Sequence, residues 1–256
     1  MLPYINILNS KISTYGILIA SGIIIANISV FHMAKKNKDS IDDIIILEGY
    51  GLIGGFIGAK LMYIAVLLNQ IGWDTLFQPK NIPLIINGGF VFYGGLILGV
   101  FTSLSCGKIH KIQTIDFLKK YIFAIPLAHA FGRLGCFFVG CCYGIPYSKI
   151  GAVRFPSNSF APHNIPLFPV QLLESILLFL LSVILYTLSK KSKSSYNIEI
   201  YLFLYGLIRV LIEFLRFDSV RGVYWGVSTS QYISFVLILI STFCFLLRKR
   251  KKGTLS

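Results

Sequence analysis

The sequence has 256 residues, of which 55% are hydrophobic and only 13% are charged, and its mean hydropathy is +0.74. This composition leaves too little polar surface for a water-soluble protein, so we predict a single transmembrane helical domain over residues 1–256. The net charge of +14 would suggest a nucleic-acid partner in a soluble protein. Here the basic residues gather in clusters between or after apolar segments, which is typical of cytoplasmic loops and argues against nucleic acid.

Seven apolar segments are long enough to cross about 30 Å of hydrocarbon as helices. In chain order they cover residues 13–33, 44–69, 88–106, 119–138, 169–189, 198–216 and 229–247. Basic clusters follow the first, third, fifth and seventh segments, at residues 35–38, 108–120, 190–193 and 248–252. The sequence therefore predicts an all-α integral membrane protein with about seven transmembrane helices, its N-terminus outside and its C-terminus in the cytoplasm.

The longest connection between these segments covers residues 139–168. It is rich in proline and aromatic residues and poor in charge, as in "FPSNSFAPHNIPLFP". Proline disfavours regular helix at this density, so we predict an irregular extracytoplasmic cap. Such a cap would cover a site at the outer leaflet.

Ionisable residues inside the predicted spans are expensive in a membrane and are therefore candidates for function. Arg209 and Glu213 are four residues apart and share a helix face, and Arg216 lies three residues further on. One interpretation is an ion pair that only lowers the cost of insertion. The other is a cationic pocket in which Arg209 and Arg133 bind phosphate, because guanidinium groups donate paired hydrogen bonds. Since Glu213 supplies one counter-charge for two arginines, we expect an anionic phospholipid headgroup to supply the rest.

The stretch "GRLGCFFVGCCYG" places three cysteines within seven residues. Four interpretations remain open: small packing residues, a disulfide between Cys136 and Cys141, a metal site, and a catalytic or substrate-contacting thiol. The spacing fits no standard zinc pattern, so no metal or cofactor is predicted. Cys141 is the best catalytic candidate, and we expect neighbouring arginines to lower its pKa. His129 lies one helical turn from Arg133 and is either a base or a satisfied interior histidine.

Several motifs, in order and over nearly the whole chain, resemble those of the prolipoprotein diacylglyceryl transferases, a family of bacterial membrane enzymes. They are "STYG" with Tyr15, "GAKLMY" with Lys60, "FYGGLILG" with Tyr93, "GRLGCFFVGC" with Arg133, "FPVQLLE" with Gln171 and Glu174, "YGLIRVLIEFLRFD" with Arg209 and Glu213, and "VSTSQYIS" with Gln231 and Ser234.

The chain departs from the family pattern at four of these positions. Cys136 and Val139 stand where the family has asparagine, Cys141 where it has glutamate, and Tyr93 where it has histidine. These replacements leave open a related membrane transferase with another acceptor, or a membrane protein that binds anionic lipid without catalysis. A small transporter is disfavoured because no internal repeat is visible.

The resemblance implies a multi-pass enzyme of the bacterial cytoplasmic membrane that moves diacylglyceryl from phosphatidylglycerol to the lipobox cysteine thiol of a preprolipoprotein signal peptide. A thioether forms and glycerol phosphate leaves. The catalytic candidates are Tyr15, Tyr93, His129 and Cys141. The substrate-binding candidates are Lys60, Arg133, Cys136, Gln171, Glu174, Arg209 and Glu213.

Overall fold

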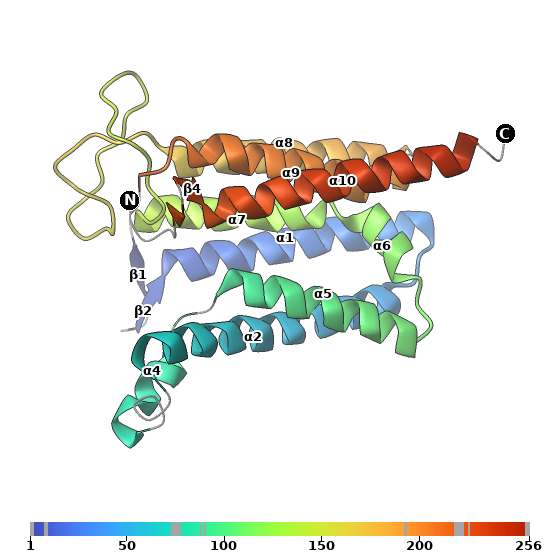
Figure 1. Ribbon diagram of the computed structural model, residues 1–256, viewed down its shortest axis with the longest axis horizontal. Helices are drawn as coiled ribbons and strands as arrows, with labels where there is room; N and C mark the ends of the chain where they lie inside the picture. Colours follow the sequence, from blue (N-terminus) through green and yellow to red (C-terminus); the bar gives the residue numbers. More distant parts are fainter. Residues whose placement is uncertain are drawn as a thin grey trace. The chain divides into compact units, whose positions relative to one another are not determined.

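The computed structural model (Figure 1) describes residues 3–7, 10–72, 78–87, 89, 91–191, 194–217, 223–224 and 226–253. Within these ranges the description covers the backbone alone at residues 6–7, 10–11, 69–70, 84, 86–87, 92–93, 194, 223–224 and 251–253. Most described residues are helical. They form two compact units: the first combines Met1–Met33 with Leu118–Ser256, and the second is Ala34–Phe117. The predicted single-domain organisation stays a prediction.

The first unit contains most of the helices. Its elements are β1 (Tyr4–Ile7), β2 (Ser10–Ser13), most of α1 (Thr14–Asn37), the end of α6 (Thr114–Tyr121), α7 (Ala124–Val139), α8 (Val170–Lys190), η2 (Ser194–Tyr196), α9 (Asn197–Glu213), β3 (Val223–Tyr224), β4 (Val227–Ser228) and α10 (Thr229–Gly253). The strands pair as two antiparallel hairpins, β1 with β2 and β3 with β4. Helix α7 packs on α8, α8 on α9, and α9 on α10.

Serine hydroxyls join α8 to α7 along their length. Ser175 Oγ donates to the carbonyl oxygen of Ala130 at 2.8 Å, and Ser182 Oγ donates to that of Phe123 at 2.8 Å. Both serines are buried. Hydroxyl groups of this kind associate helices where lipid gives no hydrophobic driving force between them.

The second unit is built on the pair α2 (Ile41–Ile71) and α5 (Phe92–Ile109), with η1 (Pro79–Asn81) and α4 (Ile82–Asn87) between them. Glycines bring these two helices together. A Cβ at Gly58 would collide with the carbonyl of Gly94 and would lie 2.5 Å from Leu98 Cβ, and one at Gly99 would lie 2.9 Å from the carbonyl oxygen of Gly51. Backbones approach this closely only between small residues. Close packing is therefore the structural role of these glycines.

The connection between α7 and α8, residues 140–169, is fully described and contains no helix. The extracytoplasmic cap expected at about 139–168 stays a prediction. It has its own small core of Phe155, Ala161 and Leu167. Its first residues pair with the chain that follows α9, since the amide of Ile145 donates to the carbonyl of Leu215 at 3.0 Å. We call residues 140–169 the cap segment.

Each of the seven predicted spans contains a helix, but the segment predicted at 119–138 is broken. Helices α6 and α7 meet at a 54° bend. Pro126 lacks an amide hydrogen and its ring clashes with the carbonyl four residues earlier, at Ile122, where the break lies. Among the residues that the structure describes, four helices are long and apolar enough to span a membrane, or five if the bent pair forms one span. The seven-span count and the orientation stay predictions.

Candidate active site

Four helix ends of the first unit meet at one place. The C-terminal half of α7 and the C-terminus of α9 lie beside the N-termini of α8 and α10, as the alternating chain direction requires (Figure 1). The cap segment and the residues after α9 connect these ends. Charged side chains from three of these regions converge there.

Five residues form a chain of alternating charge, which we call the ion-pair chain. Arg133 Nε on α7 and Arg209 Nη1 on α9 both lie 3.1 Å from Glu174 Oε1 on α8. Arg209 Nη2 lies 3.0 Å from Glu213 Oε2. Arg216 Nη1 lies 3.6 Å from the same carboxylate oxygen. An arginine therefore stands at each end of the chain, with carboxylates and Arg209 between.

The middle of the ion-pair chain is more buried than its ends. The side chains of Glu174 and Glu213 are each 2% exposed and that of Arg209 is 7% exposed, whereas Arg133 and Arg216 are 15% and 10% exposed. Charges so deeply buried are tolerated only when they are paired. The five residues carry three positive charges and two negative ones, so one positive charge is in excess among them.

Arg209 makes three side-chain hydrogen bonds. It donates from Nη1 to Glu174, and from Nη2 to both Glu213 and Ser230 Oγ, the latter at 2.9 Å. We expected Glu213 to be the single protein counter-charge of Arg133 and Arg209. That expectation is wrong, because Glu174 contacts both of them.

Sequence reasoning did not include Arg216 or Ser230 among the site residues. The spacing of three residues between Glu213 and Arg216 was a usable signal for the first. Ser230 gives no signal, because it is a common residue at the start of α10, and only the packing of α10 on α9 brings it to Arg209.

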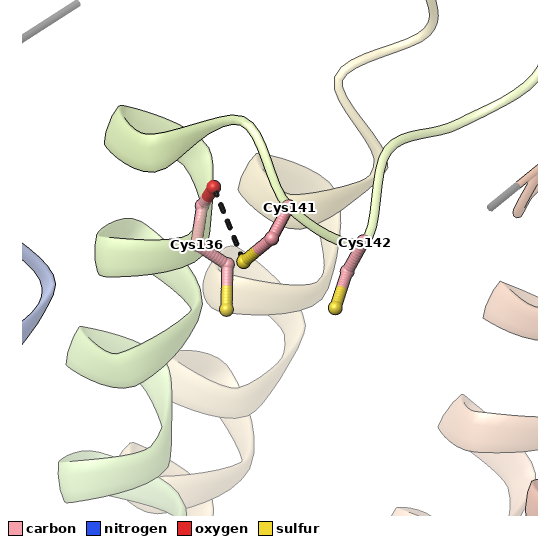
Figure 2. Close-up of side chains that lie close together, drawn as sticks. All are labelled: Cys136, Cys141 and Cys142. Carbon is pink, nitrogen blue, oxygen red and sulfur yellow. Dashed lines mark hydrogen bonds between the residues drawn. The ribbon is translucent and has the colours of Figure 1, made fainter. Parts of the chain in front are cut away.

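The three cysteines lie together at the end of α7 (Figure 2). The Sγ atoms of Cys136, Cys141 and Cys142 are all within 4.8 Å of one another, and all three thiols are free. We call these residues the thiol cluster. The Cys136–Cys141 disulfide considered from the sequence is not formed. The packing interpretation is partly met, since Cys136 is buried while the other two are half-buried.

A tight turn produces this cluster. Gly140 adopts a left-handed conformation with φ 81°, and its amide and that of Cys141 both donate to the carbonyl of Cys136, at 2.8 and 3.1 Å. A Cβ at residue 140 would lie 2.8 Å from Ser159 Cβ in the cap segment. Cys142 is also left-handed, with φ 56°, which is unusual for a residue other than glycine. The turn folds residues 141–142 back over the last turn of α7.

The two cysteines of the turn have opposite protonation tendencies. Hydrogen bonds with the thiols of Cys136 and Cys142, together with burial, raise the pKa of Cys141. Hydrogen bonds from Cys136 and Cys141, and then the charges of Arg133 and Arg216, lower the pKa of Cys142. The expectation that nearby arginines would lower the pKa of Cys141 is therefore wrong, and of the two cysteines in the turn it is Cys142 whose pKa they lower.

Other predicted site residues lie around the ion-pair chain and the thiol cluster. Tyr15, in the first turn of α1, packs against the α7 backbone, where a Cβ at Gly135 would lie 2.9 Å from the tyrosine ring. Gln171 is 1% exposed, and its Nε2 donates to the carbonyl of Cys141 at 2.8 Å. The ring of His129 lies 5.8 Å from that of Tyr205 on α9. The first unit thus contains nine of the eleven predicted site residues.

The remaining two, Lys60 and Tyr93, belong to the second unit. Lys60 is on α2 with its Nζ 5.3 Å from the centre of the Tyr63 ring. Tyr93 is the second residue of α5, and its side chain lies outside the described residues. Their roles stay predictions.

Comparisons with known proteins identify the family of the chain. The family model for prolipoprotein diacylglyceryl transferase matches residues 3–247. A Clostridium tetani protein named phosphatidylglycerol–prolipoprotein diacylglyceryl transferase is 37% identical over 243 residues, covering 94% of this chain and 95% of the relative. A second such transferase from Clostridium perfringens is 32% identical over 251 residues, covering 96% and 94%, and one from Finegoldia magna is 30% identical over 238 residues, covering 91% and 90%. The chain belongs to the prolipoprotein diacylglyceryl transferase family.

Proposed function

We propose that this protein transfers diacylglyceryl from phosphatidylglycerol to the thiol of a lipobox cysteine in a preprolipoprotein signal peptide. The observation that carries the proposal is the buried ion-pair chain, with an arginine at each of its ends. Guanidinium groups are suited to bind the phosphodiester of phosphatidylglycerol, because they donate paired hydrogen bonds to phosphate. The relatives described above carry the name of this reaction.

The reaction assigns different roles to the ends and the middle of the ion-pair chain. Arg133 and Arg216, the more exposed arginines, bind the phosphate and stabilise the charge that develops on it as the leaving group. Arg209, bonded to two carboxylates and Ser230, is a positioning residue. The sequence-based pairing of Arg133 with Arg209 is thereby replaced by Arg133 with Arg216.

The bond changes are simple to balance. The acceptor thiol loses its proton, and its sulfur forms a C–S bond to the terminal glyceryl carbon of the diacylglyceryl group. The bond between that carbon and the phosphate oxygen breaks, and glycerol phosphate leaves with the electron pair. Tyr15, His129 and Cys141 remain candidates for handling the proton, and the roles of Tyr93 and Lys60 stay predictions.

We further propose seven spans in the bacterial cytoplasmic membrane, with the N-terminus outside. Within the first unit, the site lies at the ends of α8 and α10 opposite to those that carry Lys190 and Arg248. Basic residues favour the cytoplasmic side, so this arrangement supports a site at the outer leaflet. Alkaline phosphatase fusions after α7 and after α8 test the orientation: activity is expected only after α7, and activity after α8 alone would reverse it.

A transfer assay tests the function. Purified protein in lipid nanodiscs receives phosphatidylglycerol labelled in its acyl chains and a lipobox peptide, with a matched peptide in which serine replaces cysteine. We expect label on the cysteine peptide only, and its loss in Arg133→Ala but not in Arg248→Ala. Release of glycerol phosphate without label on the cysteine peptide would indicate another acceptor. No release at all, with lipid still bound, would overturn the enzymatic proposal.

A further inference from the structure

The thiol cluster has the geometry of an incomplete metal site. Four-coordinate zinc holds thiolate sulfurs at about 2.3 Å, which places two such sulfurs ~3.8 Å apart. The three Sγ atoms already lie within 4.8 Å of one another. Figure 2 shows the sulfurs of Cys136 and Cys142 pointing in the same direction and the sulfur of Cys141 pointing toward Cys136. Closing around a cation therefore needs shifts of about 1 Å, within the reach of side-chain torsions.

The surroundings hold the backbone of the cluster in place. Gly140 fixes the turn, and Gln171 Nε2 on α8 holds the carbonyl of Cys141 at 2.8 Å. The left-handed backbone of Cys142 is the conformation that turns a second thiol of the turn toward Cys136. Support of this kind orients ligands at metal centres.

The charge balance also suits a cation. Three thiolates and one divalent cation carry a net charge of −1, and the ion-pair chain has one positive charge in excess. Arg133 lies one helical turn before Cys136 on α7. Two of the three cysteines are half-buried, so the site has a route to solvent.

We propose that Cys136, Cys141 and Cys142 bind one thiophilic divalent cation of the zinc class through their thiolates, leaving the fourth coordination position open. Three protein ligands with one open position are typical of catalytic zinc sites. We infer that the acceptor thiol occupies that position, and this second part rests on the proposed function. Coordination removes the thiol proton to solvent, and the bound thiolate then attacks the glyceryl carbon as described above.

A metal site would explain why cysteines replace two residues of the family pattern. Cys136 and Cys141 occupy positions where the family pattern has asparagine and glutamate. A metal-bound thiolate needs no carboxylate base, because the cation itself lowers the pKa of its ligand. The sequence alone hid this site, since its ligands are not arranged as two separated pairs.

Cobalt(II) binding tests the metal site without any substrate. Reduced, metal-free protein in detergent is titrated with Co²⁺, and the sulfur-to-cobalt charge-transfer absorption is recorded. We expect saturation at one Co²⁺ per chain, displacement by Zn²⁺, and loss of the absorption in Cys136→Ser/Cys141→Ser/Cys142→Ser. The matched control is Cys106→Ser/Cys244→Ser, which keeps the cluster and removes the other two cysteines.

The outcomes separate this proposal from the proposed function. Absence of the charge-transfer absorption in a wild-type protein that transfers diacylglyceryl would overturn the metal site and keep the function. Equal loss in the control variant, or a triple variant that still binds Co²⁺, would also overturn it. Circular dichroism of each variant shows whether the chain is folded.

Adding the cysteine peptide should change the absorption while the serine peptide should not. Identical spectra would remove the acceptor thiol from the fourth position.

Discussion

The two units of the molecule differ in the contacts that join their helices. In Ala34–Phe117, α2 and α5 meet mainly through glycines, with backbone against backbone, and the hydroxyls of Thr102 and Ser103 add hydrogen bonds to α2 carbonyls. In the first unit, α7, α8 and α9 meet through charged side chains and serine hydroxyls. Both arrangements join apolar helices, and that of the first unit also brings ionised side chains together.

The glycine contacts and the ion-pair chain differ in what they cost the folded state. Glycine contacts bring helices close with no buried charge. A buried ion pair costs several kcal/mol of desolvation per ion, on the order of what its attraction returns, and is often no better than apolar packing. Glycine contacts are therefore sufficient to join helices, whereas the burial of the ion-pair chain requires another reason, and the phosphate binding proposed above supplies one.

The largest effect is expected for Glu174→Gln. The substitution keeps the shape but removes the carboxylate that Arg133 and Arg209 share, which leaves two buried guanidinium groups short of one negative charge. We expect loss of most transfer activity and destabilisation by about 3 kcal/mol. Thermal unfolding in detergent and the transfer assay measure both. An active, equally stable variant would show that the shared carboxylate is dispensable.

Gly58→Ala tests the other kind of contact. The added methyl group would collide with the Gly94 carbonyl and Leu98 Cβ, and overpacking of this kind costs about 1–3 kcal/mol. The matched control is Gly49→Ala on the same helix, where a Cβ meets nothing within 4 Å. Thermal unfolding should show a lower midpoint for Gly58→Ala alone. Equal midpoints would mean that α2 and α5 are not tightly packed there.

Cys141 and Cys142, the two cysteines of the thiol cluster that lie in the cap segment, differ in the direction of their pKa shifts. Because the pKa of Cys142 is lowered and that of Cys141 is raised, Cys142 should stay a thiolate as the pH falls below the usual thiol range. Alkylation of metal-free protein, followed by peptide mass spectrometry, should therefore modify Cys142 at a lower pH than Cys141. The same pH profile at both residues, or the reverse order, would contradict the account.

The smallest effect is expected far from the site. Arg248 on α10 pairs with Glu199 at the start of α9, and its side chain is 31% exposed. Partly exposed pairs contribute about 0–1 kcal/mol. Arg248→Ala should therefore leave the unfolding midpoint nearly unchanged and keep transfer activity. A loss comparable to that of Glu174→Gln would show that burial does not decide which ion pairs matter.

The fold was largely predictable because apolar length and basic clusters are local signals. Each predicted span contains a helix. The exception is the break before Pro126, where one residue interrupts a segment whose hydrophobicity continues. The assignment of helices to two compact units depends on contacts between distant residues, and no local pattern reports those.

Part of the candidate site was predictable from spacing along the chain. Arg209 and Glu213 share a face of α9 and form an ion pair, and Arg216, just beyond the end of α9, contacts the same carboxylate. The bridge from Glu174 to Arg133 joins residues of different helices and appears only when α7, α8 and α9 pack. The thiol cluster was hidden for a different reason, because the turn at Gly140 changes which sulfurs are neighbours.

The central claim is that the end arginines of the ion-pair chain bind phosphate while Arg209 positions them. The most direct test is the KM for phosphatidylglycerol in Arg133→Lys, Arg216→Lys and Arg209→Lys, each with its unfolding midpoint. The account expects a raised KM at a near-normal midpoint for the two end variants, and a lowered midpoint for Arg209→Lys. An unchanged KM in both end variants, with a raised KM in Arg209→Lys at a normal midpoint, would contradict it.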